Sequence, residues 1–274
     1  MSRPYAEVIG DPIAHSKSPI IHNFWLEKLG IDAEYRRCHV RAEGLAEYFE
    51  RRCQDPDWRG CNLTMPHKFA ALAHVHKHRD PGFPVEPINI ALPRAGRIEG
   101  FNSDTMGVYE PLSAIMREQP SPRGAAIVVG AGGAFYSAMW ALSALGFAPV
   151  HVVMRDAAKM TQIAKDYRGL HAVPMHFEDP LPSANLLLNA TPLGMIGFPE
   201  FPLPLDSLKP DAIVFETIYY PLETRLLADA RARGLRTVEG LAMLVAQAAV
   251  GFQGFFGQPA PREHDAELRA LLTA

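Results

Sequence analysis

Short apolar runs alternate with longer amphipathic runs over the first hundred residues. The runs typical of strands lie at 5–10, 33–40, 60–65 and 97–104, and those typical of helices lie at 18–30 and 42–53. A strand followed by a helix, repeated, predicts parallel strands covered by helices. The run at 105–118 can leave this unit as a helix.

A second alternating unit begins at residue 124. Its expected strands lie at 124–130, 149–155, 184–190 and 212–218, with helices at 133–145 and from about 156. These strands are apolar without alternation, which is typical of strands buried on both faces. The last stretch, from 240, predicts two helices.

A glycine-rich turn joins the first strand of the second unit to its helix, in VVGAGGAFYSAMWALSALG at 128–146. Glycines let the backbone approach a pyrophosphate, and the N–H groups that open the helix can face it. The expected dinucleotide-binding residues are Gly130, Ala131, Gly132, Gly133 and Ala134. Phe135 replaces the third glycine of the usual G-x-G-x-x-G pattern, so a turn that serves only tight packing is the alternative.

The next strand ends in Met154-Arg155-Asp156, with Lys159 one helical turn further on. An acid at this place favours the free ribose 2′-hydroxyl of NAD, whereas cations favour the 2′-phosphate of NADP. Arg155 and Lys159 outnumber Asp156, so we expect NADP, with NAD as the alternative.

Polar residues follow three strands of the first unit, at 15–18, 62–68 and 102–104. Each group has a simpler explanation: the serines as helix caps, the lysine as an exposed surface residue, and the last group as turn residues. The carboxyl ends of parallel strands meet at one edge of a sheet. The three groups together therefore predict a site for one small polyhydroxylated ligand. His67 and Lys17 are expected to be exposed loop residues beside it.

Several short motifs occur along the chain and can be considered together. They are Gly10-Asp11-Pro12-Ile13-x-His15-Ser16-x-Ser18-Pro19-x-x-His22-Asn23, Asn62-Leu63-Thr64-x-Pro66-x-Lys68, Asn102-Ser103-Asp104, Gly130-Ala-Gly-Gly-Ala134, Asn189-Ala-Thr-Pro-Leu-Gly-Met195 and Gly240-x-x-Met243-Leu-Val-x-Gln247-Ala-Ala249. Together they closely resemble the shikimate dehydrogenase family, from about residue 5 to 257.

The resemblance implies reversible hydride transfer between NADPH and the ketone of 3-dehydroshikimate, giving shikimate without a metal, in aromatic amino acid (chorismate) biosynthesis. Lys68 matches the family's catalytic lysine and Asp104 its partner. The chemistry agrees, because negative charge grows on the carbonyl oxygen as hydride arrives, and an ammonium group can stabilise it and deliver the proton. The substrate-binding residues implied by the same matching are Ser16, Ser18, Thr64, Asn89, Asp104, Tyr219 and Gln247, and the further cofactor-binding ones are Thr191, Gly240 and Met243.

The resemblance also implies a two-domain α/β fold with an interdomain cleft. The expected substrate-binding α/β domain covers 1–104 and is completed by 240–274, and a Rossmann-type NADP-binding domain covers 105–239.

Four positions depart from the family's pattern. Met154-Arg155-Asp156 stands where Asn-Arg-Thr is usual, Thr105 where a glycine is usual, and Ile90 where a threonine is usual. NAD, and quinate or amino-substituted substrates, therefore stay open. A relative that binds shikimate or NADP without catalysis is a further alternative.

Composition and charge limit the kinds of partner that the protein is expected to bind. A net charge of -3 with both signs interspersed gives no basic footprint for nucleic acid, and no apolar run is long enough to span a membrane. Three cysteines without a C-x-x-C pair predict reduced thiols and a cytoplasmic setting. His74, His76 and His78 do not predict a metal site, because i, i+2 spacing spreads side chains around a helix. The oligomeric state is undecided, and a homodimer stays open.

Overall fold

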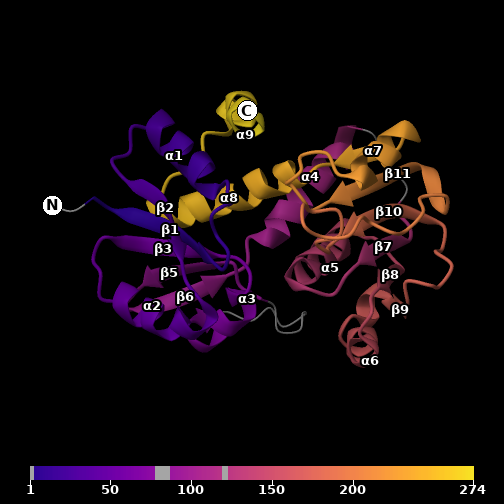
Figure 1. Ribbon diagram of the computed structural model, residues 1–274, viewed down its shortest axis with the longest axis horizontal. Coiled ribbons are helices and arrows are strands. Elements are labelled where there is room, and N and C mark those ends of the chain that lie inside the picture. Colours follow the sequence, from indigo (N-terminus) through magenta and orange to yellow (C-terminus); the bar gives the residue numbers. More distant parts are fainter. Residues whose placement is uncertain (1–2, 78–86, 119–122) are drawn as a thin grey trace. The chain divides into compact units, whose positions relative to one another are not determined.

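The structure is a computed structural model that describes residues 3–77, 87–118 and 123–274 (Figure 1). These residues form two compact units. Unit 1 holds the described residues up to Ser103 together with Gln247–Ala274, and unit 2 holds Asp104–Ala246. The boundaries expected from the sequence are after residue 104 and before residue 240. In the structure, Asp104 and the stretch 240–246 belong to unit 2.

Unit 1 is built on a six-stranded sheet in the order β2-β1-β3-β5-β6-β4. Its strands are β1 (Tyr5–Gly10), β2 (Glu34–His39), β3 (Trp58–Leu63), β4 (His76–Lys77), β5 (Ile90–Arg94) and β6 (Arg97–Phe101). Its helices are α1 (Ser18–Lys28), α2 (Leu45–Arg52), the short α3 (His67–Ala70), the second part of α8 (Gly240–Phe256) and α9 (Asp265–Thr273), with 3-10 turns at Ala42–Gly44, Ala71–Ala73 and Arg262–His264.

The all-parallel sheet expected for this unit is wrong at β5, which runs antiparallel to both β3 and β6. The cause is local: Ala95 and Gly96 are the only residues between β5 and β6, and both have positive φ, 48° and 78°. A two-residue link of this kind joins antiparallel strands. Two reversals bring β6 back to the direction of β1 and β3, so the amino end of β5 lies at the carboxyl ends of β3 and β6.

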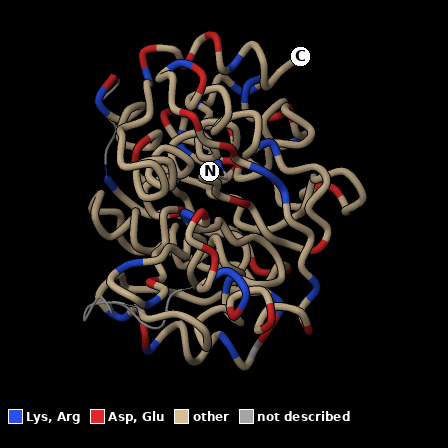
Figure 2. Tube along the Cα trace, turned by 90° about the vertical axis from the view of Figure 1, so that its left-hand side faces the viewer, with Lys and Arg blue, Asp and Glu red and all other residues tan. Residues whose placement is uncertain are grey.

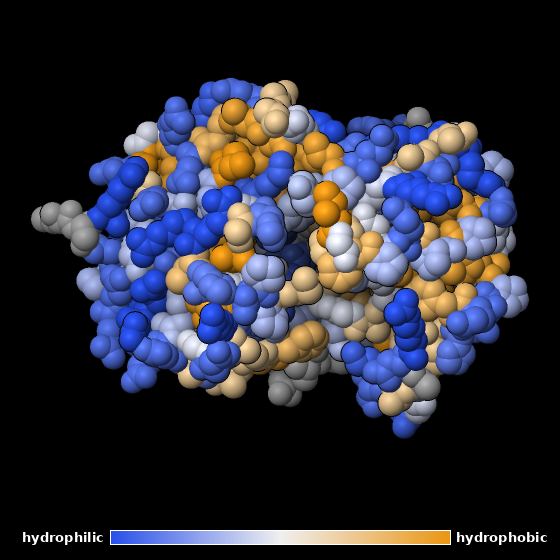
Figure 3. All heavy atoms as spheres, viewed as in Figure 1, coloured by the Kyte–Doolittle hydropathy of each residue, from blue (hydrophilic) through white to orange (hydrophobic). Residues whose placement is uncertain are grey.

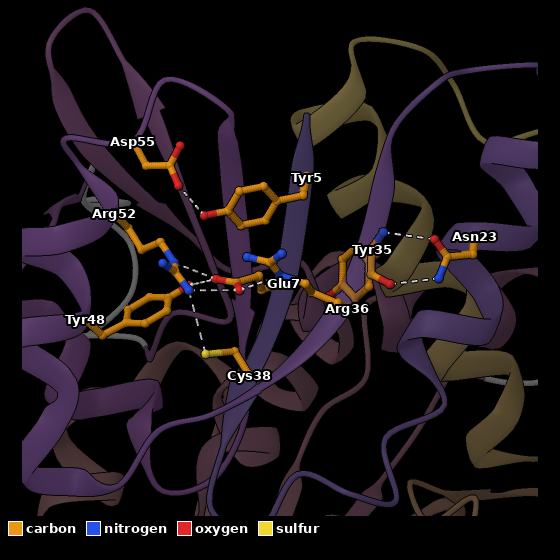
Figure 4. Close-up of polar contacts among 9 residues, drawn as sticks. All are labelled: Tyr5, Glu7, Asn23, Tyr35, Arg36, Cys38, Tyr48, Arg52 and Asp55. Atoms are coloured by element: carbon orange, nitrogen blue, oxygen red, sulfur yellow. Dashed lines mark hydrogen bonds and ion pairs between the residues drawn. The ribbon is translucent and has the colours of Figure 1, made fainter. Parts of the chain in front are cut away.

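A buried carboxylate ties β1 to its neighbours in unit 1 (Figure 4). Glu7 is 1% exposed, and its oxygens accept from Arg36 at 3.0 Å, Arg52 at 2.8 Å and the Tyr48 hydroxyl at 2.9 Å. Because Arg52 and Tyr48 lie on α2, the cluster fixes this helix against the sheet. Such a charge is tolerated in the interior because every oxygen has a donor.

The C-terminal part of α8 approaches β3 closely. A Cβ atom at Gly60 would lie 2.8 Å from the Phe255 ring and 2.6 Å from the Ala91 carbonyl oxygen, and Gly60 has a φ of 131°. Only glycine fits both conditions. The last helix, α9, packs against α1, where Lys28 pairs with Glu267 at 2.7 Å.

Unit 2 is a parallel sheet in the order β12-β11-β10-β7-β8-β9. Its strands are β7 (Ala126–Val129), β8 (Val150–Val153), β9 (Val173–Met175), β10 (Ala184–Asn189), β11 (Leu208–Glu216) and β12 (Arg236–Val238). Its helices are α4 (Asp104–Glu118), α5 (Gly133–Leu145), α6 (Ala157–Asp166), α7 (Arg225–Ala232) and the first part of α8, with a 3-10 turn at Arg168–Leu170. The short β9, α7 and β12 were not expected from the sequence.

The strand order of unit 2 is that of a Rossmann fold. From β7 the chain adds β8 and β9 on one side, then returns to add β10, β11 and β12 on the other. Every residue of β7 and β10 is buried, and alternate residues of these strands contribute to two separate cores. The α/β fold class and the burial of these strands on both faces are confirmed.

Candidate functional site

The glycine turn of unit 2 lies where the strand order reverses. Gly130 follows β7 with a φ of 102°, and a Cβ atom there would lie 2.6 Å from Thr191 Cγ2 and 3.0 Å from the Ala190 carbonyl oxygen. Thr191 follows β10, the other strand at the reversal, so the structure brings these two predicted residues together. In open α/β sheets ligands bind at this point, outside the carboxyl ends of the strands.

Space is available at the start of α5. A Cβ atom at Gly132, which precedes the helix, would have no heavy atom within 4 Å. The helix spans Gly133–Leu145, long enough for its first N–H groups and dipole to favour an anion. These observations fit a pyrophosphate at the turn formed by Gly130, Ala131, Gly132, Gly133 and Ala134.

The missing third glycine does not disturb this turn. Phe135 is fully buried in the core of unit 2, with ring centroids 5.3 Å from Tyr136 and 5.4 Å from Tyr167. In the usual pattern the third glycine serves close packing of helix and strand. Phe135 therefore packs α5 into the core, and Gly130 keeps a positive φ of 102° in the turn.

At the end of β8 the acidic residue and the two basic residues have different roles in the structure. Asp156 is the N-cap of α6: its Oδ1 accepts from the N–H groups of Ala158 at 3.0 Å and Lys159 at 3.2 Å. Arg155 is exposed, with its guanidinium carbon 5.4 Å from the centroid of the Phe177 ring, and the Lys159 side chain is exposed as well. Because the carboxylate is engaged by the helix, the two cations dominate this end of the sheet.

The polar edge of unit 1 centres on Asn89, just before β5. Its Nδ2 donates to Ser103 Oγ at 3.0 Å and, more weakly, to Gln247 Oε1 at 3.4 Å, and its Oδ1 accepts from the Ser103 N–H at 2.7 Å. Asn89, Ser103 and Gln247 are 3%, 2% and 8% exposed. The reversed β5 explains this gathering, because the residue before β5 lies beside the residues that follow β6.

Further hydrogen bonds hold the backbone of Asn89 in place. The Tyr35 hydroxyl donates to Asn62 Oδ1 at 2.6 Å, and Asn62 Nδ2 donates to the Asn89 carbonyl oxygen at 3.2 Å. Tyr35 is itself stacked on His22, with ring centroids 4.0 Å apart. His22 is fully buried, and burial lowers its pKa to about 3.

Lys68 is half-buried on α3, directly after β3. Its carbonyl oxygen accepts from the Ile88 N–H at 3.0 Å, and the Thr64 carbonyl oxygen accepts from the His67 N–H at 2.9 Å, so the turn that carries the lysine is fixed at both ends. His67 is fully buried with its Nε2 2.6 Å from the Val40 carbonyl oxygen. The Lys17 ammonium group donates to the Leu272 carbonyl oxygen. The expectation that His67 is an exposed loop residue is wrong, whereas Lys17 lies in the loop before α1, as expected, but is half-buried.

The remaining predicted residues divide between the two units. Ser16, whose Oγ accepts from the Ser18 N–H at 3.3 Å, belongs to unit 1 with Thr64, while Asp104 and Tyr219 belong to unit 2. The pairing of Asp104 with Lys68 stays a prediction.

Two residues of α8 were predicted to bind the cofactor. Gly240 lies against the segment after β11, where a Cβ atom would be 2.2 Å from the Ile218 carbonyl oxygen. Met243 is 8% exposed and packs in the core of unit 2.

Some supporting residues were missed from the sequence. Ser103 and Asn62 belong to the polar groups expected around the ligand, but their role in supporting Asn89 was not predicted, and Tyr35 gave no signal because its partner is distant in sequence. Glu216 could have been noticed in the sequence, because it is a charged residue at the end of an apolar run. Within the described residues no group of three or more His, Cys, Asp or Glu could hold a metal; His78 lies outside them.

Comparison with known proteins agrees with this geometry. Residues 8–90 match the model of the shikimate dehydrogenase substrate binding domain. A shikimate dehydrogenase (NADP(+)) from Sphingopyxis alaskensis is 46% identical over 273 residues, 99% of this chain and 97% of the relative.

Solved structures share the whole fold. Shikimate 5-dehydrogenase from Thermus thermophilus, in complex with NADP(H) and shikimate, aligns with a TM-score of 0.82 at 32% identity and covers 98% of this chain and 99% of its own. Quinate dehydrogenase from Corynebacterium glutamicum, in complex with NAD, aligns with a TM-score of 0.86 at 25% identity and the same coverage. With this similarity over nearly its full length, the chain belongs to the shikimate dehydrogenase family.

Proposed function

We propose that this protein is an NADP-dependent shikimate dehydrogenase that reversibly reduces 3-dehydroshikimate to shikimate in chorismate biosynthesis. The relative from Sphingopyxis alaskensis carries the same activity and cofactor in its name. The observation that carries the cofactor assignment is the capping role of Asp156, which leaves Arg155 and Lys159 as the groups available to a 2′-phosphate.

The residues divide the work of holding the two ligands. The turn at Gly130–Ala134 would hold the pyrophosphate, Arg155 and Lys159 the 2′-phosphate, and Thr191, Gly240 and Met243 the nicotinamide end. Bound NADPH supplies the hydride. Ser16, Ser18, Thr64, Tyr219 and Gln247 would hold the substrate carboxylate and ring hydroxyls, together with Asn89.

Lys68 carries the chemical step on the protein side. Its ammonium group would stabilise the negative charge that grows on the carbonyl oxygen and give its Nζ proton to that oxygen. Asp104 would orient the ammonium group and accept a hydrogen bond from the neighbouring ring hydroxyl. In the reverse direction neutral Lys68 takes the proton from the hydroxyl of shikimate. This assignment requires substrate and cofactor to meet in the cleft predicted between the units.

Asn89 gains a clear role from its contacts. Its amide is fixed by Ser103 and Gln247 before any ligand arrives. A preorganised side chain loses little conformational freedom on binding. Asn89 would therefore select a ring hydroxyl at one position of the substrate.

A quinate dehydrogenase that uses NAD is the second candidate. Thr105 lies in the first turn of α4, where the family usually has glycine, and Ile90 replaces the usual threonine after Asn89. The structural neighbour named for quinate was solved with NAD.

A steady-state assay decides between the candidates. Shikimate and quinate are crossed with NADP and NAD, and reduced-cofactor absorbance gives four values of kcat/KM. Dominance of shikimate with NADP supports the proposal, and dominance of quinate or NAD supports the second candidate. Binding of both ligands without turnover over a wide pH range would refute both and leave the non-catalytic alternative.

We also propose a cytoplasmic protein that acts on small molecules rather than on nucleic acid. Lys and Arg are interspersed with Asp and Glu along the described chain (Figure 2), and its three cysteines are free. No helix among the described residues has the length and hydropathy needed to cross a membrane. Figure 3 shows a mostly hydrophilic face with several hydrophobic patches. The proposed assembly is a homodimer, and sedimentation equilibrium would test it.

A further inference from the structure

A fully buried carboxylate ends β11. Glu216 has 0% exposure, and none of the roles proposed above uses it. Its Oε1 accepts from Asn189 Nδ2 at 3.0 Å and from the Ile218 N–H at 3.1 Å, and its Oε2 accepts from Thr224 Oγ1 at 3.0 Å.

The donors to Glu216 come from three separate segments. Asn189 ends β10, the strand next to β11; Ile218 follows β11; and Thr224 is the N-cap of α7, where its hydroxyl also accepts from the Leu227 N–H (Figure 1). One side chain thus ties together the end of β10, the segment 217–224 and the start of α7.

The Asn189 side chain extends this link toward the cofactor side of the unit. Its Oδ1 accepts from the N–H of Thr191 at 3.0 Å and from the Thr191 hydroxyl at 2.6 Å. The Thr217 hydroxyl donates to the Asn189 carbonyl oxygen at 2.8 Å. Thr191 was assigned to the cofactor, and Tyr219, inside the segment 217–224, to the substrate.

A purely structural role explains this arrangement poorly. Burying a carboxylate is costly, and an apolar side chain of similar volume often stabilises a core as well or better. Burial also raises the pKa of Glu216 to about 7, although its hydrogen bonds oppose that shift. The benefit of the carboxylate is the position of its three donors.

We propose that Glu216 is a positioning residue for the reaction, which fixes the segments that carry Thr191 and Tyr219 without itself touching substrate or cofactor. This inference rests on the proposed function, because it uses the roles assigned there to Thr191 and Tyr219.

The test compares three variants of the full-length protein. Glu216→Leu fills a similar volume but removes the acceptor of the Ile218 N–H, of the Thr224 hydroxyl and of one Asn189 N–H group, while Asn189 Nδ2 keeps its bond to the Leu193 carbonyl oxygen at 3.0 Å. Glu216→Gln keeps an oxygen for Asn189 and Ile218, and its amide can donate to Thr224 Oγ1. Ile213→Val, in the same strand, removes one methyl group from a fully buried side chain and is the control for general destabilisation.

Three measurements are made on each variant: KM and kcat for shikimate and NADP, the thermal midpoint, and hydrogen exchange of the peptides that contain 190–194 and 217–224. In Glu216→Leu both KM values should rise about tenfold, because unpaired buried donors force the two segments to move. Exchange should quicken in those two peptides. Glu216→Gln should stay within about threefold of wild type, and Ile213→Val should lower the midpoint with both KM values unchanged.

Unchanged KM values and unchanged exchange in a folded Glu216→Leu protein would overturn the proposal. If that variant does not fold, Thr224→Val against Thr224→Ser decides, since only the serine keeps the hydroxyl. We expect a severalfold higher shikimate KM in the valine variant, and equal values would also overturn the proposal. A wild-type protein without turnover would instead refute the proposed function, and the exchange data would still show whether Glu216 holds the two segments.

Discussion

Replacement of Arg155 by alanine should convert a preference for NADP into near indifference between the two cofactors. Arg155 is exposed at the end of β8, and only NADP offers it a phosphate. NAD carries a hydroxyl at the same place, so loss of the guanidinium group removes nothing that NAD uses.

The expected magnitude follows from the surroundings of the side chain. A hydrogen bond to a charged group contributes about 1.5–3 kcal/mol, and the exposure of Arg155 favours the lower end of this range. About 1.5–2 kcal/mol corresponds to an increase of about 10–30-fold in KM for NADP. Lys159 remains in the variant and prevents a larger loss. KM for NAD should change by less than about twofold.

The assay measures kcat/KM for both cofactors at one ionic strength, because exposed charges are screened over a Debye length of about 10 Å at 0.1 M salt. Lys165→Ala is the matched control, since it removes one exposed positive charge from the last turn of the same helix, α6. Equal weakening of NADP and NAD in Arg155→Ala, or an equal effect in the control, would refute the contact with the 2′-phosphate.

Three further changes test other parts of the molecule. Lys68→Ala should lower kcat by about 10²–10⁴-fold with little change in shikimate affinity, and near-normal turnover would refute its catalytic role. Tyr35→Phe removes the donor to Asn62; it should lower the free energy of unfolding by about 1–2 kcal/mol and raise the shikimate KM, and unchanged kinetics would disconnect this hydrogen bond from Asn89. Burial lowers the pKa of His22 from 6.5 to about 3. Between pH 7 and pH 5 His22 therefore binds a proton in the unfolded chain but stays neutral in the folded chain, and the free energy of unfolding falls by about 2 kcal/mol. Urea unfolding of wild type and His22→Phe at pH 7 and pH 5 measures this loss, which the phenylalanine variant should not show; equal losses in the two proteins would contradict it. Glu216 acts in the opposite direction, because its raised pKa stabilises the fold as pH falls, but it is present in both proteins and cancels in the comparison.

The candidate site was visible in the sequence because parallel strands turn linear order into spatial order. Each strand that ends in polar residues delivers them to one edge, so Thr64 after β3 and Ser103 after β6 could be placed together from the sequence alone. Thr191 was assigned to the cofactor from the resemblance alone, although it also follows a buried strand, and the structure brings it beside Gly130. Residue types at strand ends are local information.

The direction of β5 was missed because the decisive signal was two residues long. Ala95-Gly96 lies between two short strands, and the repeated strand–helix order earlier in the unit favoured a parallel arrangement. Positive φ at an alanine is uncommon, so the sequence did not announce a hairpin turn as Asn-Gly would have done. The error concerned strand direction but not the edge at which Asn89 lies.

The residues that hold the site in place were the hardest to predict. Asp156 was interpreted from its charge, although an aspartate before a helix also caps it, and the structure shows that the cap is made. Tyr35 and Asn62 are 27 positions apart, and Asn189 and Glu216 are also 27 positions apart. Their pairing depends on which strands become neighbours, which a single sequence does not state.

Local patterns therefore identify the groups that can touch a ligand, and non-local pairing decides how rigidly those groups are held. Asn89 illustrates the difference. Its amide type fits a hydroxyl ligand in any fold, but its orientation depends on Ser103, after the end of β6, and on Gln247 of α8. A substitution at either partner leaves Asn89 in place and still changes the orientation of the amide that the substrate meets. Specificity between shikimate and quinate should consequently respond to Ser103 and Gln247 as well as to Thr105 and Ile90, because a hydroxyl is selected by the position of its partner and not by the partner's identity alone.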